Sequence, residues 1–90
     1  MIADNPRATL AATLRDGANG VEVRSVRRGS RAEAAGLRAG DVIASIDEVQ
    51  VARARDATTS LRGAEGEEVA LDIERNGRAM RLLVPRERAP

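Results

Sequence analysis

The chain has 90 residues, a formal net charge of +1, and no aromatic residue, histidine or cysteine. This length makes one small domain with a core of aliphatic side chains and methionine, and the missing cysteines and histidines exclude a disulfide framework and the usual zinc sites. The near-neutral charge gives no global field that would steer the chain to nucleic acid or to an acidic membrane.

The ends of the chain carry no targeting or membrane signal. Residues 1–9 lack the apolar stretch of a signal peptide. No run approaches the ~20 apolar residues that span a bilayer, so we expect no direct membrane insertion. We expect a single domain over residues 1–90 with a core of about 8–85 and loose ends at 1–6 and 86–90.

The first predicted elements are two strands. Residues 10–14 are expected to form the first strand, and residues 16–20 a turn. Val21, Val23 and Val26 then lie on one face of a second, half-buried strand, because polar residues interrupt them.

The segment from Gly29 to Ile46 carries local signals for a helix cap, a short helix, its end, a turn and a strand, in that order. Ser30 is the predicted N-cap of a short helix over residues 31–35. Gly36 supplies the left-handed residue that ends it, and Leu37 folds back as the hydrophobic contact. A turn at Gly40 then leads into a strand over residues 42–46, and the acidic residues of this region are predicted to be turn residues: Asp41, Asp47 and Glu48.

A helix and a hairpin are predicted in the second half, after a short return strand at Val49 and Val51. The helix covers residues 55–62, with Gly63 as its stop, and tertiary packing must hold it because residues 58–60 are poor helix formers. A solvated charge run follows at Glu65, Glu67 and Glu68. Residues 69–73 and 80–84 alternate in hydropathy on either side of Asn76-Gly77, the strongest short signal for a hairpin, and Pro85 stops the second strand.

These elements make a mixed α+β, mainly β chain, and their order resembles a bacterial PDZ domain, similar to those attached to HtrA-like serine proteases. The segments that carry the resemblance cover roughly residues 8–85: Gly20-Val21-Glu22-Val23, Gly29-Ser30, Ala34-Ala35-Gly36-Leu37, Gly40-Asp41-Val42-Ile43, the helix around Leu61, and Arg75-Asn76-Gly77. The resemblance implies a small, partly open antiparallel barrel of five to six strands capped by two helices.

It also implies peptide binding. Such domains bind an extended C-terminal segment as an added strand between an edge strand and the second helix, and a loop of backbone N–H groups receives the terminal carboxylate. The peptide-binding residues implied for this sequence are, on the loop and edge strand, Arg7, Ala8, Thr9, Leu10, Ala11 and Ala12, and, on the helix, Thr58, Leu61 and Arg62.

The implied partners are protein or peptide C-termini and a protease domain in the same parent protein, to which the module delivers substrate or which it regulates. A parent of the HtrA type places the domain in the periplasm or another extracytoplasmic compartment. The sequence itself leaves the compartment open.

The implied loop departs from the family pattern of hydrophobic, glycine, hydrophobic. Leu10-Ala11-Ala12 stands in its place. Alanine disfavours a positive φ by roughly 1 kcal/mol relative to glycine, and Ala12 presents little apolar surface. We therefore expect a shallow pocket.

Three other functions have less support. Catalysis is not expected, because Ser30 has neither histidine nor lysine as a base, and no cofactor is implied. The acidic residues do not follow a calcium-loop spacing, so no metal site is predicted. Nucleic-acid binding rests on one group of arginines, interleaved with glutamates and without aromatic platforms: Arg24, Arg27, Arg28, Arg31 and Arg38. The main rival to peptide binding is a structural or assembly domain whose degenerate groove binds no free C-terminus.

Overall fold

A computed structural model describes residues 7–88. In chain order its elements are β1 (Arg7–Ala8), β2 (Ala12–Gly17), β3 (Gly20–Val26), α1 (Arg31–Ala34), β4 (Val42–Ile46), β5 (Val49–Gln50), α2 (Ala54–Leu61), β6 (Gly63–Ala64), β7 (Glu68–Arg75) and β8 (Arg78–Pro85).

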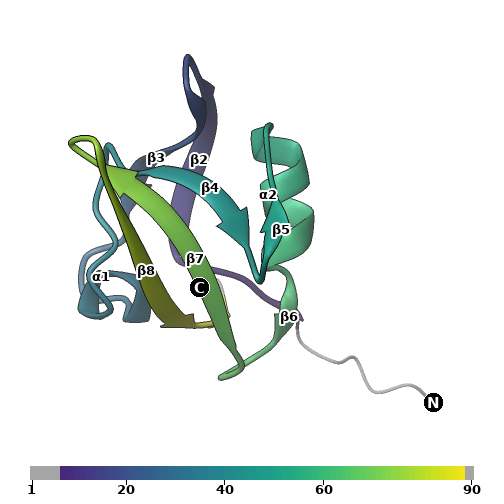
Figure 1. Cartoon of the computed structure of the whole chain (residues 1–90). Coiled ribbons are helices and arrows are strands. Elements are labelled where there is room, and N and C mark those ends of the chain that lie inside the picture. The colour runs from purple at the N-terminus through teal and green to yellow at the C-terminus, as the bar shows by residue number, and fades with distance from the viewer. Residues whose placement is uncertain (1–6, 89–90) are drawn as a thin grey trace.

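The strands form one main antiparallel sheet that does not close on itself. Its order is β2-β3-β4-β7-β8, with β5 paired to β4, and β1 and β6 make a separate two-stranded pair. The helices lie on opposite sides of the molecule, α1 beside β8 and α2 beside β5 (Figure 1). The predicted mainly β architecture, a partly open sheet of five to six strands with two helices, is confirmed, and the main sheet has six strands.

The core is aliphatic, as the composition requires. Buried residues alternate with exposed ones along β3 and β7, so each strand turns one face inward. A single hydrophobic cluster includes Val21, Val23, Ile43, Leu71 and Ile73, each no more than 1% exposed. In a domain of this size the burial of these side chains supplies most of the driving force for folding.

The predicted N-cap and C-terminal stop of α1 are confirmed. The Ser30 Oγ accepts a hydrogen bond from the Glu33 N–H at 3.1 Å. Gly36 has a φ of 101°, and the Leu37 N–H donates to the Ala32 carbonyl at 3.0 Å. Leu37 is 2% exposed, so the helix end also contributes to the core.

The hairpin of β7 and β8 is confirmed with its turn. Asn76 and Gly77 have φ values of 52° and 78°, as a type I′ turn requires. Asp47 and Glu48 also have positive φ, 49° and 71°, in the turn between β4 and β5.

Several predicted boundaries shift: α1 ends one residue early, at Ala34, and the strands of the hairpin extend to Glu68–Arg75 and Arg78–Pro85. The first long strand covers Ala12–Gly17 instead of residues 10–14, because the two-residue turn at Ala18 and Asn19 lets the strand continue as far as Gly17. The second helix begins and ends one residue earlier than predicted, at Ala54 and Leu61.

The prediction of a loose end from residue 86 onward is wrong for Arg86 and Glu87. Arg86 is 4% exposed. The Glu87 backbone exchanges hydrogen bonds with Thr9 at 2.8 and 3.1 Å. Arg88 is exposed and lies in no helix or strand, and residues 1–6 and 89–90 lie outside the described residues.

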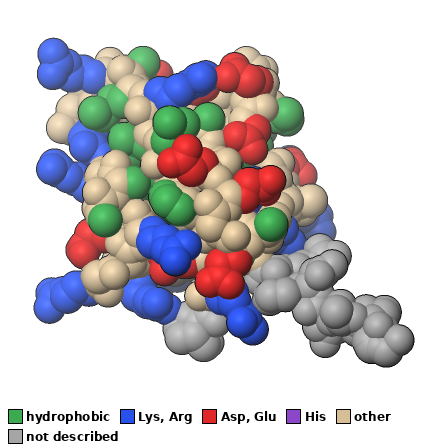
Figure 2. All heavy atoms as spheres, turned by 90° about the horizontal axis from the view of Figure 1, so that it is seen from below, with side chains coloured by type: hydrophobic (Ala, Val, Ile, Leu, Met, Phe, Trp, Pro, Cys, Tyr) green, Lys and Arg blue, Asp and Glu red, His purple; other side chains and the backbone are tan. Residues whose placement is uncertain are grey.

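The surface is mixed in charge. Seen from below, acidic and basic side chains are interspersed around apolar ones on one face (Figure 2). Neither helix of the described region has the length and hydropathy needed to cross a membrane.

Asp41, predicted to be a turn residue, is instead the buried partner of an ion pair. Its carboxylate is 2% exposed and accepts two hydrogen bonds from the Arg75 guanidinium, both at 2.8 Å. Burial raises the pKa of Asp41, but hydrogen bonds from Arg75 and from the Arg38 N–H, with the charges of both residues, outweigh burial and leave the pKa below its ordinary value.

Because the folded protein holds this carboxyl at a lowered pKa, the unfolded chain binds the proton more readily. The stabilisation is present above the ordinary value of 3.8 and is lost as the pH falls through the lower folded value. Thermal unfolding followed from pH 7 to pH 2 is expected to show a falling Tm below about pH 4. Asp41→Asn is expected to lower the Tm at pH 7 and to flatten that fall. Glu65→Gln, at an exposed turn position, serves as the control; an equal flattening in this variant contradicts the assignment to Asp41.

Candidate functional site

The open edge of β2 and the neighbouring helix α2 form the candidate site. β2 is the terminal strand of the sheet, and α2 packs against it (Figure 1). Leu10 and Leu61 belong to one buried cluster, and Ala12 and Leu14 pack against that cluster while staying partly exposed. The surface between strand and helix is therefore apolar at its floor.

The backbone of β2 has free positions along this edge. Antiparallel pairing alternates between residues that bond the neighbouring strand and residues that turn their N–H and C=O away from it. The Arg27 N–H donates to the Ala11 carbonyl at 2.9 Å just before β2, and Gly17 pairs with Gly20 at its other end. Counted from either end, the outward positions are Ala12, Leu14 and Asp16.

The loop before β2 is held by the chain's C-terminal segment. Thr9 pairs with Glu87, whereas the N–H groups of Leu10 and Ala11 have no acceptor among residues 7–88. Ala11 has no positive φ. The loop therefore forms without the left-handed residue for which the family pattern uses glycine, so alanine causes no backbone strain here.

Helix α2 has weak caps of its own. Its N-cap residue, Arg53, makes no side-chain capping bond. The Ala54 N–H donates instead to the Asp16 Oδ1 at 2.7 Å, which ties the helix to the end of β2. The Thr58 hydroxyl donates back to the Ala54 carbonyl, as the Thr59 hydroxyl does to Arg55, so both hydroxyls are used within the helix.

The other end of α2 is held by Arg86. Its guanidinium donates to the carbonyls of Leu61 at 2.6 Å and Ser60 at 3.4 Å and to the Glu67 carboxylate at 2.8 Å. A side chain at Gly63 would place a Cβ 2.8 Å from the Arg86 Nε. Gly63, predicted as the stop of the helix, follows the C-cap residue Arg62 without a positive φ and leaves room for the guanidinium. Glu67 is paired with Arg86 instead of belonging only to a solvated run.

The structure brings some of the predicted binding residues together. Leu10 and Leu61 share the buried cluster with Ala12 packed on it, and Thr58 and Arg62 are exposed. The backbone of Arg7 and Ala8 is paired with β6, so these two residues belong to a strand next to the loop and not to the loop itself.

Sequence reasoning missed other residues at this site. Leu14 and Asp16 could have been found from the alternation of β2 once its bounds were known. No local signal points to Arg86 or Glu87, because their contacts lie more than 18 residues away in the sequence.

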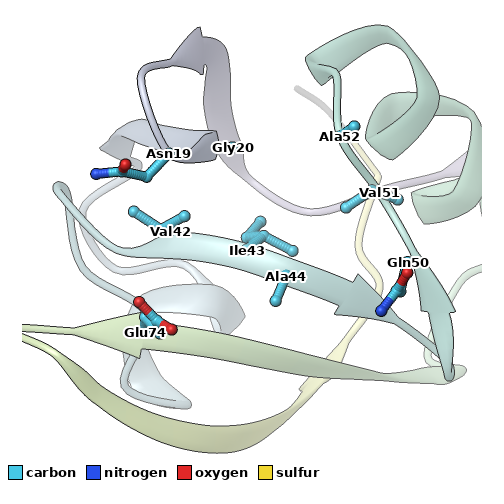
Figure 3. Close-up of a pocket in the computed structure, with 9 residues that line it drawn as sticks. All are labelled: Asn19, Gly20, Val42, Ile43, Ala44, Gln50, Val51, Ala52 and Glu74. Atoms are coloured by element: carbon cyan, nitrogen blue, oxygen red, sulfur yellow. The ribbon is translucent and has the colours of Figure 1, made fainter.

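Two hollows lie near the site without being part of the β2–α2 surface. One, of about 490 Å³, is lined by the loop residues 9–13 together with Ser25, Arg27 and Glu87, and by no residue of α2. The other, of about 440 Å³, lies where β4 changes its partner from β3 to β5, and Glu74 and Gln50 border it (Figure 3). Within residues 7–88 no three acidic side chains gather closely enough to hold a metal ion.

Comparison with known proteins identifies the fold and the family. The family model described as PDZ domain matches residues 8–85. Zinc metalloprotease RasP of Shouchella clausii (strain KSM-K16) is 49% identical over 51 residues, which are 57% of this chain and 12% of that protein.

Two solved structures share the fold. The HtrA-type protease AlgW with a decapeptide has a TM-score of 0.85 at 23% identity, over 93% of this chain and 30% of that one. The HtrA3 PDZ domain bound to the phage-derived ligand FGRWV has a TM-score of 0.77 at 13% identity, over 89% and 85% of the two chains. The present chain spans 12% of the length of RasP and 30% of that of AlgW.

The contribution of the Arg86 hydrogen bonds to stability can be measured with a substitution. Arg86→Ala leaves the Leu61 carbonyl without its donor in a buried position, and we expect a loss of about 2–4 kcal/mol in the free energy of unfolding measured with urea. Arg88→Ala, at an exposed position two residues on, is expected to change it by less than about 0.5 kcal/mol. Equal losses in the two variants contradict a specific role for Arg86.

Proposed function

This chain belongs to the PDZ domain family, and we propose that it binds the C-terminal segment of a protein or peptide as an added strand along β2. The family and its relatives support a peptide-binding, protein-interaction module. The proposal adds the mode of binding and the residues that carry it.

The observation that carries the proposal is the unpaired edge of β2 beside an apolar floor. An added strand needs outward N–H and C=O groups, which Ala12 and Leu14 offer, and apolar surface for alternate side chains, which the cluster of Leu10 and Leu61 offers.

The loop before β2 offers backbone N–H donors for the terminal carboxylate of a peptide. The N–H groups of Leu10 and Ala11 are adjacent and have no acceptor among the described residues. Two free N–H groups side by side can donate to a carboxylate, and hydrogen bonds to an ionised acceptor are stronger than neutral ones. The small side chains of Ala11 and Ala12 leave the terminal pocket shallow, so the backbone and the carboxylate contribute most of the affinity.

The protease relatives suggest the biological setting. RasP and AlgW are proteases by name, and this chain matches a small part of each. We propose that the domain serves a protease in the same parent protein, by delivering substrate or by regulating access to it, and has no catalytic role of its own. The rival function, an assembly domain with a degenerate groove, predicts that no free C-terminus binds.

A C-terminal peptide display library separates these two functions. We expect apolar peptides with a free carboxylate to be selected, and amidation of their C-terminus to weaken binding at least about tenfold, a loss of roughly 1.4 kcal/mol. Isothermal titration or fluorescence anisotropy measures the difference. No selected peptide, or equal binding of acid and amide, contradicts the proposal.

A pair of helix variants locates the site. Thr58→Glu places a negative charge on the side of α2 that continues from Ala54, and we expect it to weaken binding about tenfold by repulsion of the carboxylate. Thr59→Glu is the matched control, because its hydroxyl makes the same kind of bond within the helix but lies about 100° further around it. A similar loss in both variants places the peptide elsewhere.

A further inference from the structure

One segment of the chain carries most of its unbalanced positive charge. Residues 24–38 hold five arginines and one glutamate, a net charge of +4, whereas the whole chain has +1. All other residues together therefore carry −3. We call the five exposed arginines of this segment the arginine corner: Arg24, Arg27, Arg28, Arg31 and Arg38.

Backbone hydrogen bonds bring the parts of this segment together. The Gly40 N–H donates to the Val23 carbonyl at 2.8 Å, so the loop after α1 lies beside β3. The Ser30 N–H donates to the Arg27 carbonyl at 3.2 Å, so the turn after β3 leads directly into α1. Basic side chains gather along the left edge of the face in Figure 2, the side on which α1 lies in Figure 1.

Ion pairs do not neutralise the arginine corner. Two glutamate carboxylates at the corner accept backbone N–H groups, Glu33 from Gly29 at 2.8 Å and Glu87 from Arg31 at 2.7 Å. The Arg31 guanidinium donates to the Arg86 carbonyl at 3.2 Å, which fixes its place without removing its charge. The ion pairs within residues 7–88 use four other arginines: Arg15, Arg75, Arg81 and Arg86.

The arginine corner lacks the features by which a protein or a nucleic acid is recognised. Protein interfaces have an apolar core, but the large exposed hydrophobic side chains of the described region lie elsewhere, at Val49, Met80 and Leu83. Helix α1 has four residues, too few to read base edges along a groove, and the chain has no aromatic side chain on which bases stack. Anionic lipid headgroups require neither feature, because they attract basic residues through charge.

We propose that the arginine corner holds the domain on an anionic membrane surface by charge, without insertion of any segment into the bilayer. Each arginine close to such a surface strengthens binding about fivefold. Helix α2 lies on the side opposite α1 (Figure 1), so the bound domain keeps α2 turned toward the solvent. This inference goes beyond the proposed function and does not depend on it.

Vesicle co-sedimentation with the full 90-residue chain tests the proposal. Vesicles of phosphatidylglycerol and phosphatidylcholine in equal parts are expected to bind the protein at about 0.1 M salt and to release it at about 1 M salt, where the Debye length falls to about 3 Å. Vesicles of phosphatidylcholine alone are expected to bind no protein. Equal binding to both kinds of vesicle, or binding that salt does not weaken, overturns the proposal.

Two double variants with the same change in net charge locate the surface. Arg27→Gln with Arg28→Gln is expected to weaken binding to the mixed vesicles about 25-fold. Arg53→Gln with Arg55→Gln, at exposed positions at the start of α2, is expected to weaken it by less than about threefold, because salt screens charges far from the membrane. All four side chains are exposed, so both variants are expected to keep the urea unfolding curve of the wild type. Equal losses of vesicle binding in the two variants overturn the assignment to the arginine corner.

Two other polyanions test the competing partners. A DNA duplex and an oligoglutamate peptide are titrated at the same salt and compared with the mixed vesicles at equal concentration of negative charge. We expect both to bind more weakly, because a rigid duplex meets few arginines of a corner and a flexible peptide loses conformational entropy on binding. Tighter binding of either one overturns the proposal and assigns the corner to nucleic acid or to acidic protein. Vesicle binding by a chain that selects no peptide supports this inference and contradicts the proposed function.

Discussion

The geometry of the site depends on charged side chains that hold helix α2 from outside the helix. Its eight residues include Thr58, Thr59 and Ser60, which favour helix weakly. Arg86 satisfies carbonyls at the C-terminal end, and Asp16 accepts from the first N–H. A short helix whose ends carry unsatisfied groups gains most from such partners. The position of α2 beside β2 is thus set by residues 25 and 38 positions away in the chain.

The short segment after β8 connects more of the structure than its length suggests. Arg86 holds α2, the Glu87 backbone pairs with Thr9, and the Glu87 carboxylate accepts from the Arg31 N–H at the start of α1. Helix α2, the loop before β2 and the first helix therefore share one anchor. The family match stops at residue 85, so this anchor lies just beyond the part of the chain that the family has in common.

Local chemistry made most of the fold predictable. Asn76-Gly77 adopts positive φ in the turn that its type demands, and the helix between Ser30 and Gly36 begins and ends through bonds within a few residues. Leu10, Ala12 and Leu61, which the sequence analysis placed together at the candidate site, do meet in one apolar cluster, and their part in peptide binding stays a prediction. The roles of Gly63 and Asp41 were not predicted, because a glycine or an aspartate in a turn looks the same whether or not an arginine packs against it.

By itself, the sequence determined the order and kind of the elements, the aliphatic core and the family resemblance, because hydrophobic periodicity and turn chemistry act over a few residues. The tertiary structure alone decided which charges are structural. Asp16, Asp41 and Arg86 each resemble solvated surface residues in the sequence, and their contacts with Ala54, Arg75 and Leu61 span 25 to 38 positions. Electrostatic pairing and capping depend on distance in space, and no periodicity in the chain records it. The hydrogen bond between the end of β2 and the start of α2 is for that reason a property of the folded molecule.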